Sequence, residues 1–206
     1  MWQPGNYSGK YHGRVNLRTA LAYSYNAAAV RLLQKTGVKS VMAFAEKAGI
    51  TSAMPADLSL ALGAGDVSLL EITAAYNVFA GNGTSSPPVF IDKIVMTDGE
   101  VRRFSDGRPR RKIMSLKELH QMQSMLAEVI HRGTGRKVRS VPGVRGGKTG
   151  TSNDYRDAWF IGYDGKLTSG VWLGNDHNRS LGHGESGGTA AAPVWRDFML
   201  SLKQNN

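Results

Sequence analysis

The stretch 146–163, with the sequence GGKTGTSNDYRDAWFIGY, constrains the fold more than any other part of this chain. The tripeptide Lys148-Thr149-Gly150, followed by Thr151, is typical of a β-strand that binds a carboxylate. The lysine supplies a positive charge, and the two threonines supply hydroxyl donors. The glycine removes a side chain where a ligand would lie against the backbone. The tripeptide alone occurs by chance in many chains, so its interpretation depends on its surroundings.

The residues around and after this tripeptide predict an antiparallel sheet and a closing helix. Asp164-Gly165 is a turn sequence between two apolar runs. The predicted strands are residues 146–152, 158–163 and 167–174. We expect a final helix over about 191–202, with four side chains directed inward: Val194, Trp195, Phe198 and Leu202. For Trp159 and Trp172, as for Trp195, we expect core packing.

The first part of the chain predicts helices. Apolar residues recur at helical spacing over 17–23, 27–34 and 38–48, and Gly37 and Gly49 are suited to end the second and third of these helices. Ser24-Tyr25-Asn26 lies where the first two helices join, and in such a turn serine and asparagine are common for purely structural reasons.

Two capping boxes predict the starts of two further helices. Ser68-Leu-Leu-Glu71 and Ser115-Leu-Lys-Glu118 each place a serine and a glutamate three residues apart before an apolar stripe. The expected inward stripes are Ile72, Ala75, Tyr76 and Phe79 in the first helix and Leu119, Met122, Leu126 and Val129 in the second. The glycines of Arg132–Gly135 are expected to adopt left-handed conformations and to end the helix that begins after Ser115.

Together these elements predict an α+β fold, with helices packed on an antiparallel sheet. The helical part covers about 15–135, and the sheet with the terminal helix covers 146–203. Asp98-Gly99 predicts a hairpin over 89–104, which we place at the periphery because a basic run follows it directly.

The basic run contributes to a net charge of +10. Six residues between 102 and 112 are basic, against one acid, Asp106. Aromatic interleaving and a known nucleic-acid module are both absent, so we expect a solvated loop and no nucleic-acid partner. Attraction to anionic lipid headgroups or to an acidic wall polymer is the alternative interpretation.

Composition excludes several kinds of site. The sequence has no cysteine, so disulfides, thiolate metal sites and a cysteine nucleophile are excluded. Its five histidines lack the spacing of metal ligands, so we predict no metal and no cofactor. No apolar run approaches the ~20 residues that a helix needs to span a bilayer.

Short motifs in a fixed order run along almost the whole chain. They are Trp2–Tyr7, Gly9–Tyr11, Ser24–Asn26, Leu58–Gly65, Ser68–Tyr76, Arg132–Gly135, Lys148–Gly150, Asp157–Phe160, Gly170–Gly174 and Ala191–Trp195. This series resembles the transpeptidase domain of class A (bifunctional) penicillin-binding proteins, the bacterial enzymes that cross-link peptidoglycan. The resemblance implies the penicillin-binding and serine β-lactamase type of fold.

One motif of that family is missing. The family's nucleophile is the serine of Ser-x-x-Lys, upstream of Ser-x-Asn, and no serine of this chain has a lysine three residues later. The nearest imitation, Thr36-Gly-Val-Lys39, lies downstream of Ser24 and is therefore out of order. We therefore expect residues 1–206 to be a partial domain that begins after the nucleophile helix, with three of the family's five central strands. A naturally degenerate relative is the alternative.

The resemblance also implies roles for the residues of the site. Ser24 would relay a proton in serine acyl transfer, and Asn26 would bind an amide of the donor peptide. Lys148 would hold the terminal carboxylate and tune the relay. Thr149, Gly150, Thr151 and Ser152 would form the substrate-binding edge, and the backbone amide of Thr151 would be one half of an oxyanion hole.

The implied function is peptidoglycan cross-linking at the extracytoplasmic face of the bacterial inner membrane. The expected ligands are stem peptides ending in D-alanyl-D-alanine and β-lactams, and a membrane anchor would lie in the upstream part. Without the nucleophile, these residues alone are predicted to be inactive. The alternatives are a non-catalytic peptidoglycan-peptide-binding module (a pseudoenzyme) and a β-lactamase or β-lactam sensor. An uncovered sheet edge and apolar face would favour marginal stability or self-association.

Overall fold

The computed structural model describes residues 4–104 and 110–204. Trp2 of the first motif, and Asp106 and Arg108 of the basic run, lie outside the described residues. Within the described parts of the chain, no helix is both long enough and apolar enough to cross a membrane.

Six α-helices occur in the described residues, at the places that the sequence predicts. They are α1 (Leu17–Ala22), α2 (Asn26–Thr36), α3 (Val38–Ala48), α4 (Leu69–Ala80), α5 (Leu116–His131) and α6 (Ala192–Gln204). Short helical turns occur at Leu58–Leu62, Arg136–Val138 and Asn153–Tyr155, and a π-helical turn at Gly187–Ala191 leads into α6. Both predicted capping boxes are confirmed, because Ser68 with Glu71 and Ser115 with Glu118 make the reciprocal bonds at the starts of α4 and α5.

The main sheet is a three-stranded antiparallel meander in the order β5-β6-β7. Its strands are β5 (Gly146–Thr151), β6 (Asp157–Tyr163) and β7 (Thr168–Gly174). At the turn between β6 and β7, the carboxylate of Asp164 accepts hydrogen bonds from the backbone amides of Lys166 and Leu167, at 2.7 and 2.8 Å. The predicted meander is therefore confirmed.

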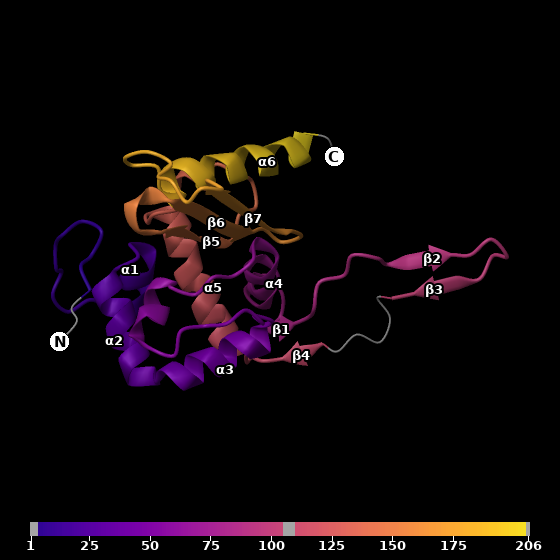
Figure 1. Ribbon diagram of the computed structural model, residues 1–206, viewed down its shortest axis with the longest axis horizontal. Helices are drawn as coiled ribbons and strands as arrows, with labels where there is room; N and C mark the ends of the chain where they lie inside the picture. The colour runs from indigo at the N-terminus through magenta and orange to yellow at the C-terminus, as the bar shows by residue number, and fades with distance from the viewer. Residues whose placement is uncertain (1–3, 105–109, 205–206) are drawn as a thin grey trace.

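Helices cover both faces of this sheet (Figure 1). Alternation along β6 directs Phe160 to one face, where its ring packs edge-on against Trp195 of α6, with the centroids 5.2 Å apart. Ile161 points to the opposite face, on which α4 packs against β7 and α5 packs against β5. A second apolar cluster joins α3 and α4 through Ala48, Ile50, Ala75 and Val78.

The inward face of α6 differs from the predicted one. Val194 and Phe198 are each 47% exposed, whereas Trp195 and Met199 are buried. Trp195 and Met199 belong to the main apolar cluster, which also contains Phe160, and Leu202 is partly buried against it. Apolar residues cover more than half of this helix, so their periodicity alone could not select the buried face.

The hairpin of residues 89–104 projects from the body as an arm (Figure 1). Its strands β2 (Lys93–Val95) and β3 (Val101–Arg103) are shorter than predicted, and β1 (Thr84–Ser85) pairs with β4 (Arg111–Lys112) at its base. The arm carries these exposed apolar side chains: Val89, Phe90, Ile91, Ile94, Val95, Met96, Val101 and Phe104.

Substitutions on the two sides of α6 test which side of this helix is buried. Met199→Ala is expected to lower the free energy of unfolding by roughly 2–5 kcal/mol, because it leaves a cavity in the main cluster. Phe198→Ala, one residue away, is expected to lower it by less than about 1 kcal/mol. Urea denaturation measures both values. Equal losses in the two variants would contradict the assignment of the buried face.

The exposed arm and the outer edge of β5 motivate a second prediction. We expect either concentration-dependent association in sedimentation experiments or a low midpoint of thermal unfolding, since apolar surface and strand edges remain uncovered. A monomer at high concentration that melts above about 65 °C would contradict it.

Candidate active site

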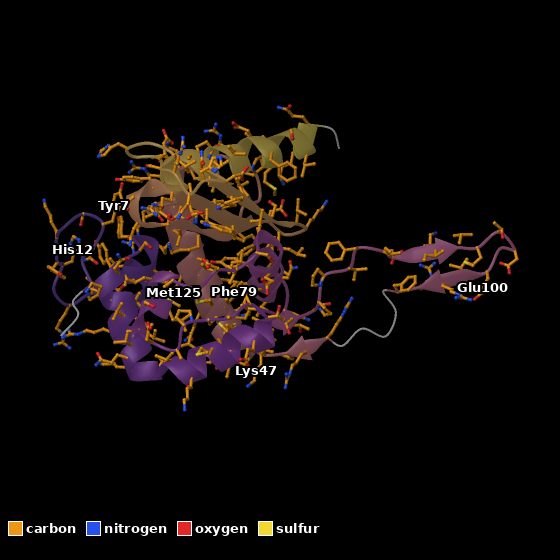
Figure 2. All side chains as sticks on the ribbon, in the orientation of Figure 1. Tyr7, His12, Lys47, Phe79, Glu100 and Met125 are labelled. Atoms are coloured by element: carbon orange, nitrogen blue, oxygen red, sulfur yellow. The ribbon has the colours of Figure 1, made fainter. Side chains whose placement is uncertain are left out.

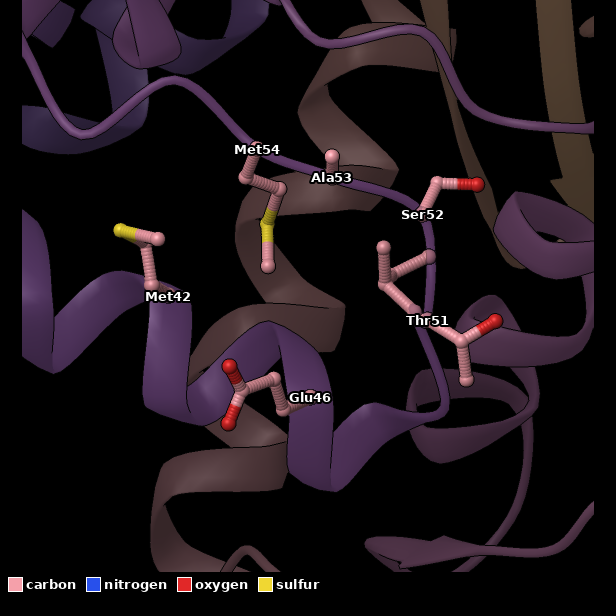
Figure 3. A pocket seen from close by; sticks show the side chains of 7 residues that line it. Met42, Glu46, Thr51, Ser52, Ala53 and Met54 are labelled. Atoms are coloured by element: carbon pink, nitrogen blue, oxygen red, sulfur yellow. The ribbon is translucent and has the colours of Figure 1, made fainter.

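A cleft of about 1900 Å³ runs between the helices and the sheet. Every site residue that the sequence predicts lines it: Ser24, Asn26, Lys148, Thr149, Gly150, Thr151 and Ser152. A second cavity of about 540 Å³ lies between α3 and the segment that follows it, lined by Met42, Glu46 and Met54 among others (Figure 3). None of the predicted site residues lines this second cavity.

Ser24 occupies a strained turn between α1 and α2. Its φ of 56° lies in the left-handed region, which a residue other than glycine adopts only at a cost of ~1–3 kcal/mol. The amide of Ser24 donates to the carbonyl of Leu21 at 3.2 Å, and the amide of Tyr25 donates to that of Ala20 at 2.9 Å. These bonds hold the serine in a conformation that its own preference disfavours.

The loop Arg132–Gly135 packs against this turn. The amide of Thr134 donates to the carbonyl oxygen of Ala22 at 3.0 Å. A Cβ on Gly133 would overlap that same oxygen. Neither Gly133 nor Gly135 has a positive φ, so the predicted left-handed conformations are wrong. Gly133 is required for close approach of two backbones.

Lys148 reaches across the cleft from β5 to the Ser24 turn. Its Nζ donates to Ser24 Oγ at 2.8 Å and to the carbonyl oxygen of Thr149 at 2.9 Å. No carboxylate within residues 4–104 and 110–204 forms an ion pair with this ammonium group. Burial lowers the pKa of Lys148 to about 8, because the charged form loses hydration and gains no anionic partner in the described residues.

The register of β5 leaves polar backbone groups at its outer edge. Ser152 donates its amide to the carbonyl of Asp157 at 3.1 Å, so the even-numbered residues of β5 pair with β6. In an antiparallel pair, alternate residues direct their backbone groups to opposite sides. The amides of Thr149 and Thr151 therefore face the open edge of the sheet.

The hydroxyl groups along β5 have specific partners. Thr149 Oγ1 lies 2.6 Å from Thr134 Oγ1, which joins β5 to the loop that supports Ser24. Thr151 Oγ1 accepts from the amide of Gly187 at 3.0 Å, and Ser152 Oγ accepts from that of Asp157 at 2.7 Å. Because these two oxygens act as acceptors, their O–H groups remain able to donate to a ligand.

Two tryptophans in the cleft correct the sequence interpretation. Trp159 and Trp172 were expected in the core, but both line the cleft, and Trp172 is 42% exposed. They lie opposite each other in β6 and β7, on the same face as Lys148 and Gly150. Counting strand alternation from Lys148 could have placed them there. Trp172 Nε1 donates to Asp157 Oδ1 at 2.9 Å.

Asn26 also lines the cleft, at the first residue of α2. Its Nδ2 donates to the carbonyl of Gly5 at 3.0 Å. Within the described residues, no three His, Asp or Glu side chains gather closely enough to hold a metal ion. The cleft thus offers a lysine, hydroxyl groups, amides and aromatic walls.

Comparison with known proteins agrees with this geometry. The family model of the penicillin binding protein transpeptidase domain matches residues 1–200. Penicillin-binding protein 1A of Aquifex aeolicus is 42% identical over 199 residues, which are 96% of this chain and 27% of that protein. Penicillin-binding protein 1A of Neisseria cinerea is 36% identical over 97% of this chain and 26% of its own length. The chain thus spans about a quarter of the length of these curated relatives.

Solved structures show the same fold. Penicillin-Binding Protein 1A from Haemophilus influenzae superposes with a TM-score of 0.85 and 26% identity, over 100% of this chain and 37% of that one. The PonA1 protein from Mycobacterium tuberculosis, in complex with penicillin V, superposes with a TM-score of 0.81 and 22% identity, over 95% of this chain and 58% of that one. This chain belongs to the penicillin-binding protein transpeptidase domain family.

Proposed function

We propose that this chain is part of a D,D-transpeptidase domain that takes part in peptidoglycan cross-linking and binds stem peptides ending in D-alanyl-D-alanine. The observation that carries the proposal is the contact of Lys148 Nζ with Ser24 Oγ, 2.8 Å across the cleft. It joins two motifs that lie 124 residues apart in the sequence. The family match and the relatives named 1A support the same function.

In this proposal the outer edge of β5 binds the peptide carboxylate. Lys148 carries an ammonium group without a carboxylate partner in the described residues, so a ligand carboxylate would satisfy it. Thr149 and Thr151 can add hydroxyl donors. The Thr151 amide at the open edge is one donor of the oxyanion hole, with the second expected from the nucleophile itself.

Ser24 acts in this proposal as a proton relay. Its Oγ accepts a hydrogen bond from Lys148, so its own O–H can donate to a leaving amine. A lysine with a pKa of about 8 can also exchange protons near neutral pH. Asn26 would bind an amide group of the donor peptide.

These residues lack Ser-x-x-Lys, so we propose that they bind ligands without forming an acyl-enzyme. A non-catalytic peptide-binding module would use the same cleft, and a β-lactamase or β-lactam sensor would share the Lys148 motif. The match to proteins named 1A favours a transpeptidase over the last of these. For the longer protein we propose an extracytoplasmic location at the bacterial inner membrane, with a membrane anchor outside these residues.

Peptide binding tests the proposed function. A peptide ending in D-alanyl-D-alanine should bind non-covalently in calorimetry, and its C-terminal amide should bind at least ~tenfold more weakly, because the charge-assisted bonds to Lys148 are lost. Lys148→Met should abolish this difference between the two peptides.

Three outcomes separate the alternatives. Equal affinity for the acid and the amide would contradict a carboxylate site on β5. A covalent adduct of these 206 residues with a fluorescent penicillin, seen by mass spectrometry, would overturn the proposed inactivity. Hydrolysis of a chromogenic cephalosporin would favour a β-lactamase.

The pKa of Lys148 predicts a pH dependence of stability. Its folded-state pKa of about 8 lies below the unfolded value of ~10.4, so between these values the unfolded chain binds more protons. Stability relative to Lys148→Met should therefore rise by roughly 1–3 kcal/mol as pH increases from 7.5 to 10.5. Urea denaturation of both proteins at each pH measures the difference. A constant difference would show that burial does not lower this pKa.

A further inference from the structure

The segment Gly5–Tyr7, termed here the clamp segment, belongs to the first sequence motif and has no part in the chemistry proposed above. All three of its residues line the cleft. On the helical side, the carbonyl of Gly5 accepts from Asn26 Nδ2 at 3.0 Å. The next residue, Asn6, accepts from the backbone amide of Ala27 through its Oδ1 at 3.1 Å. Two successive residues thus grip the start of α2.

Asn6 supplies what the start of α2 otherwise lacks. The first amides of a helix have no partners within the helix, and the residue before it usually caps one of them. The cap position of α2 is Tyr25, whose side chain makes no such bond. Asn6 caps the Ala27 amide from 21 residues away. The helix that carries Asn26 is therefore fixed from outside.

The bond to Gly5 orients the amide group of Asn26. A side-chain amide has two N–H donors and one acceptor oxygen. One N–H is used by Gly5, which sets the plane of the group and leaves the second N–H and Oδ1 for a ligand. The clamp segment thus fixes the orientation of the Asn26 side chain, which the proposed function assigns to binding an amide of the donor peptide.

Tyr7 contacts Tyr155 on the opposite wall of the cleft. Its hydroxyl lies 2.8 Å from that of Tyr155, and the two rings are perpendicular, with the centroids 6.2 Å apart. Figure 2 shows Tyr7 at the edge of the body, between the sheet and α1. Tyr7 is 73% exposed, so this contact is accessible to water.

Tyr155 lies in a turn that hydrogen bonds hold in place. Asp154 and Tyr155 both have a left-handed φ, of 59° and 55°, although neither is glycine. The amide of Leu181 donates to the Tyr155 carbonyl at 2.8 Å, and Ser180 Oγ donates to that of Asp154 at 2.6 Å. The segment around residue 180 thus keeps the strained turn in place.

We propose that the clamp segment is a positioning and specificity device for a peptide ligand. Asn6 fixes the start of α2 and so positions Ser24 and Asn26, and the pair formed by Tyr7 and Tyr155 closes one end of the cleft and sets its width. The identity of the ligand rests on the proposed function, but the clamp itself does not.

Paired variants test the helical side. Asn6→Ala should make the Ala27 amide exchange with deuterium ~tenfold faster, because its acceptor is lost. Asn6→Asp keeps an acceptor oxygen at a helix N-terminus and should restore slow exchange. In Asn6→Ala the NMR-measured pKa of Lys148 should also move, since Ser24 loses its fixed position. Unchanged exchange and an unchanged pKa would overturn the positioning role.

A double-mutant cycle tests the tyrosine pair. Tyr7→Phe and Tyr155→Phe should each weaken binding of a D-alanyl-D-alanine peptide by ~2–10-fold, and the double variant should bind no more weakly than either single one. Each should also speed exchange of the amides of residues 153–155 in the free protein. The control is Tyr11→Phe, because the hydroxyl of Tyr11 donates to the carbonyl of Pro4, seven residues away, and does not cross the cleft.

The readouts separate the two proposals. If the wild-type chain binds no peptide, the proposed function fails, and amide exchange in the free protein still decides on the clamp. Additive effects in the double variant, or an equal effect of Tyr11→Phe, would overturn the tyrosine closure.

Discussion

A half-buried ammonium group without an anionic partner among the described residues organises this molecule. Lys148 Nζ bonds to Ser24 Oγ and to a carbonyl oxygen, which are neutral acceptors, and burial lowers its pKa to about 8. A chain selected for stability alone would place an apolar residue or an ion pair at such a position. The free-energy cost of burying this ammonium group without an anion is explained if a ligand carboxylate binds beside it.

The surroundings of Lys148 are arranged to keep this contact. Ser24 is held in a left-handed conformation by α1 on one side and by the loop at Gly133 on the other. The two threonine hydroxyls 2.6 Å apart, on Thr134 and Thr149, join that loop to β5. Three otherwise unfavourable features thus keep Lys148 in contact with Ser24. They are the strain at Ser24, the close backbone approach at Gly133 and the edge position of β5.

Much of this structure could be predicted from local sequence. The capping boxes at Ser68 and Ser115 and the turn at Asp164 depend on neighbouring residues, and all three form as predicted. The motif at Lys148 and the turn at Ser24 were also expected at one cleft, which they share. The prediction of the buried face of α6 was wrong, since apolar residues make up more than half of that helix. Gly133 and the clamp segment act through contacts between distant segments, which periodicity does not encode. The position of Trp172 could have been predicted from strand alternation.

The most direct test of the account is the position of a bound ligand. A crystal structure with a D-alanyl-D-alanine peptide should place the peptide carboxylate within ~3 Å of Lys148 Nζ and of the Thr149 or Thr151 hydroxyl, with the chain extended along the outer edge of β5. A peptide bound outside this cleft, for example in the cavity beside Met42, with Lys148 still bonded only to Ser24 and its own backbone, would contradict the account.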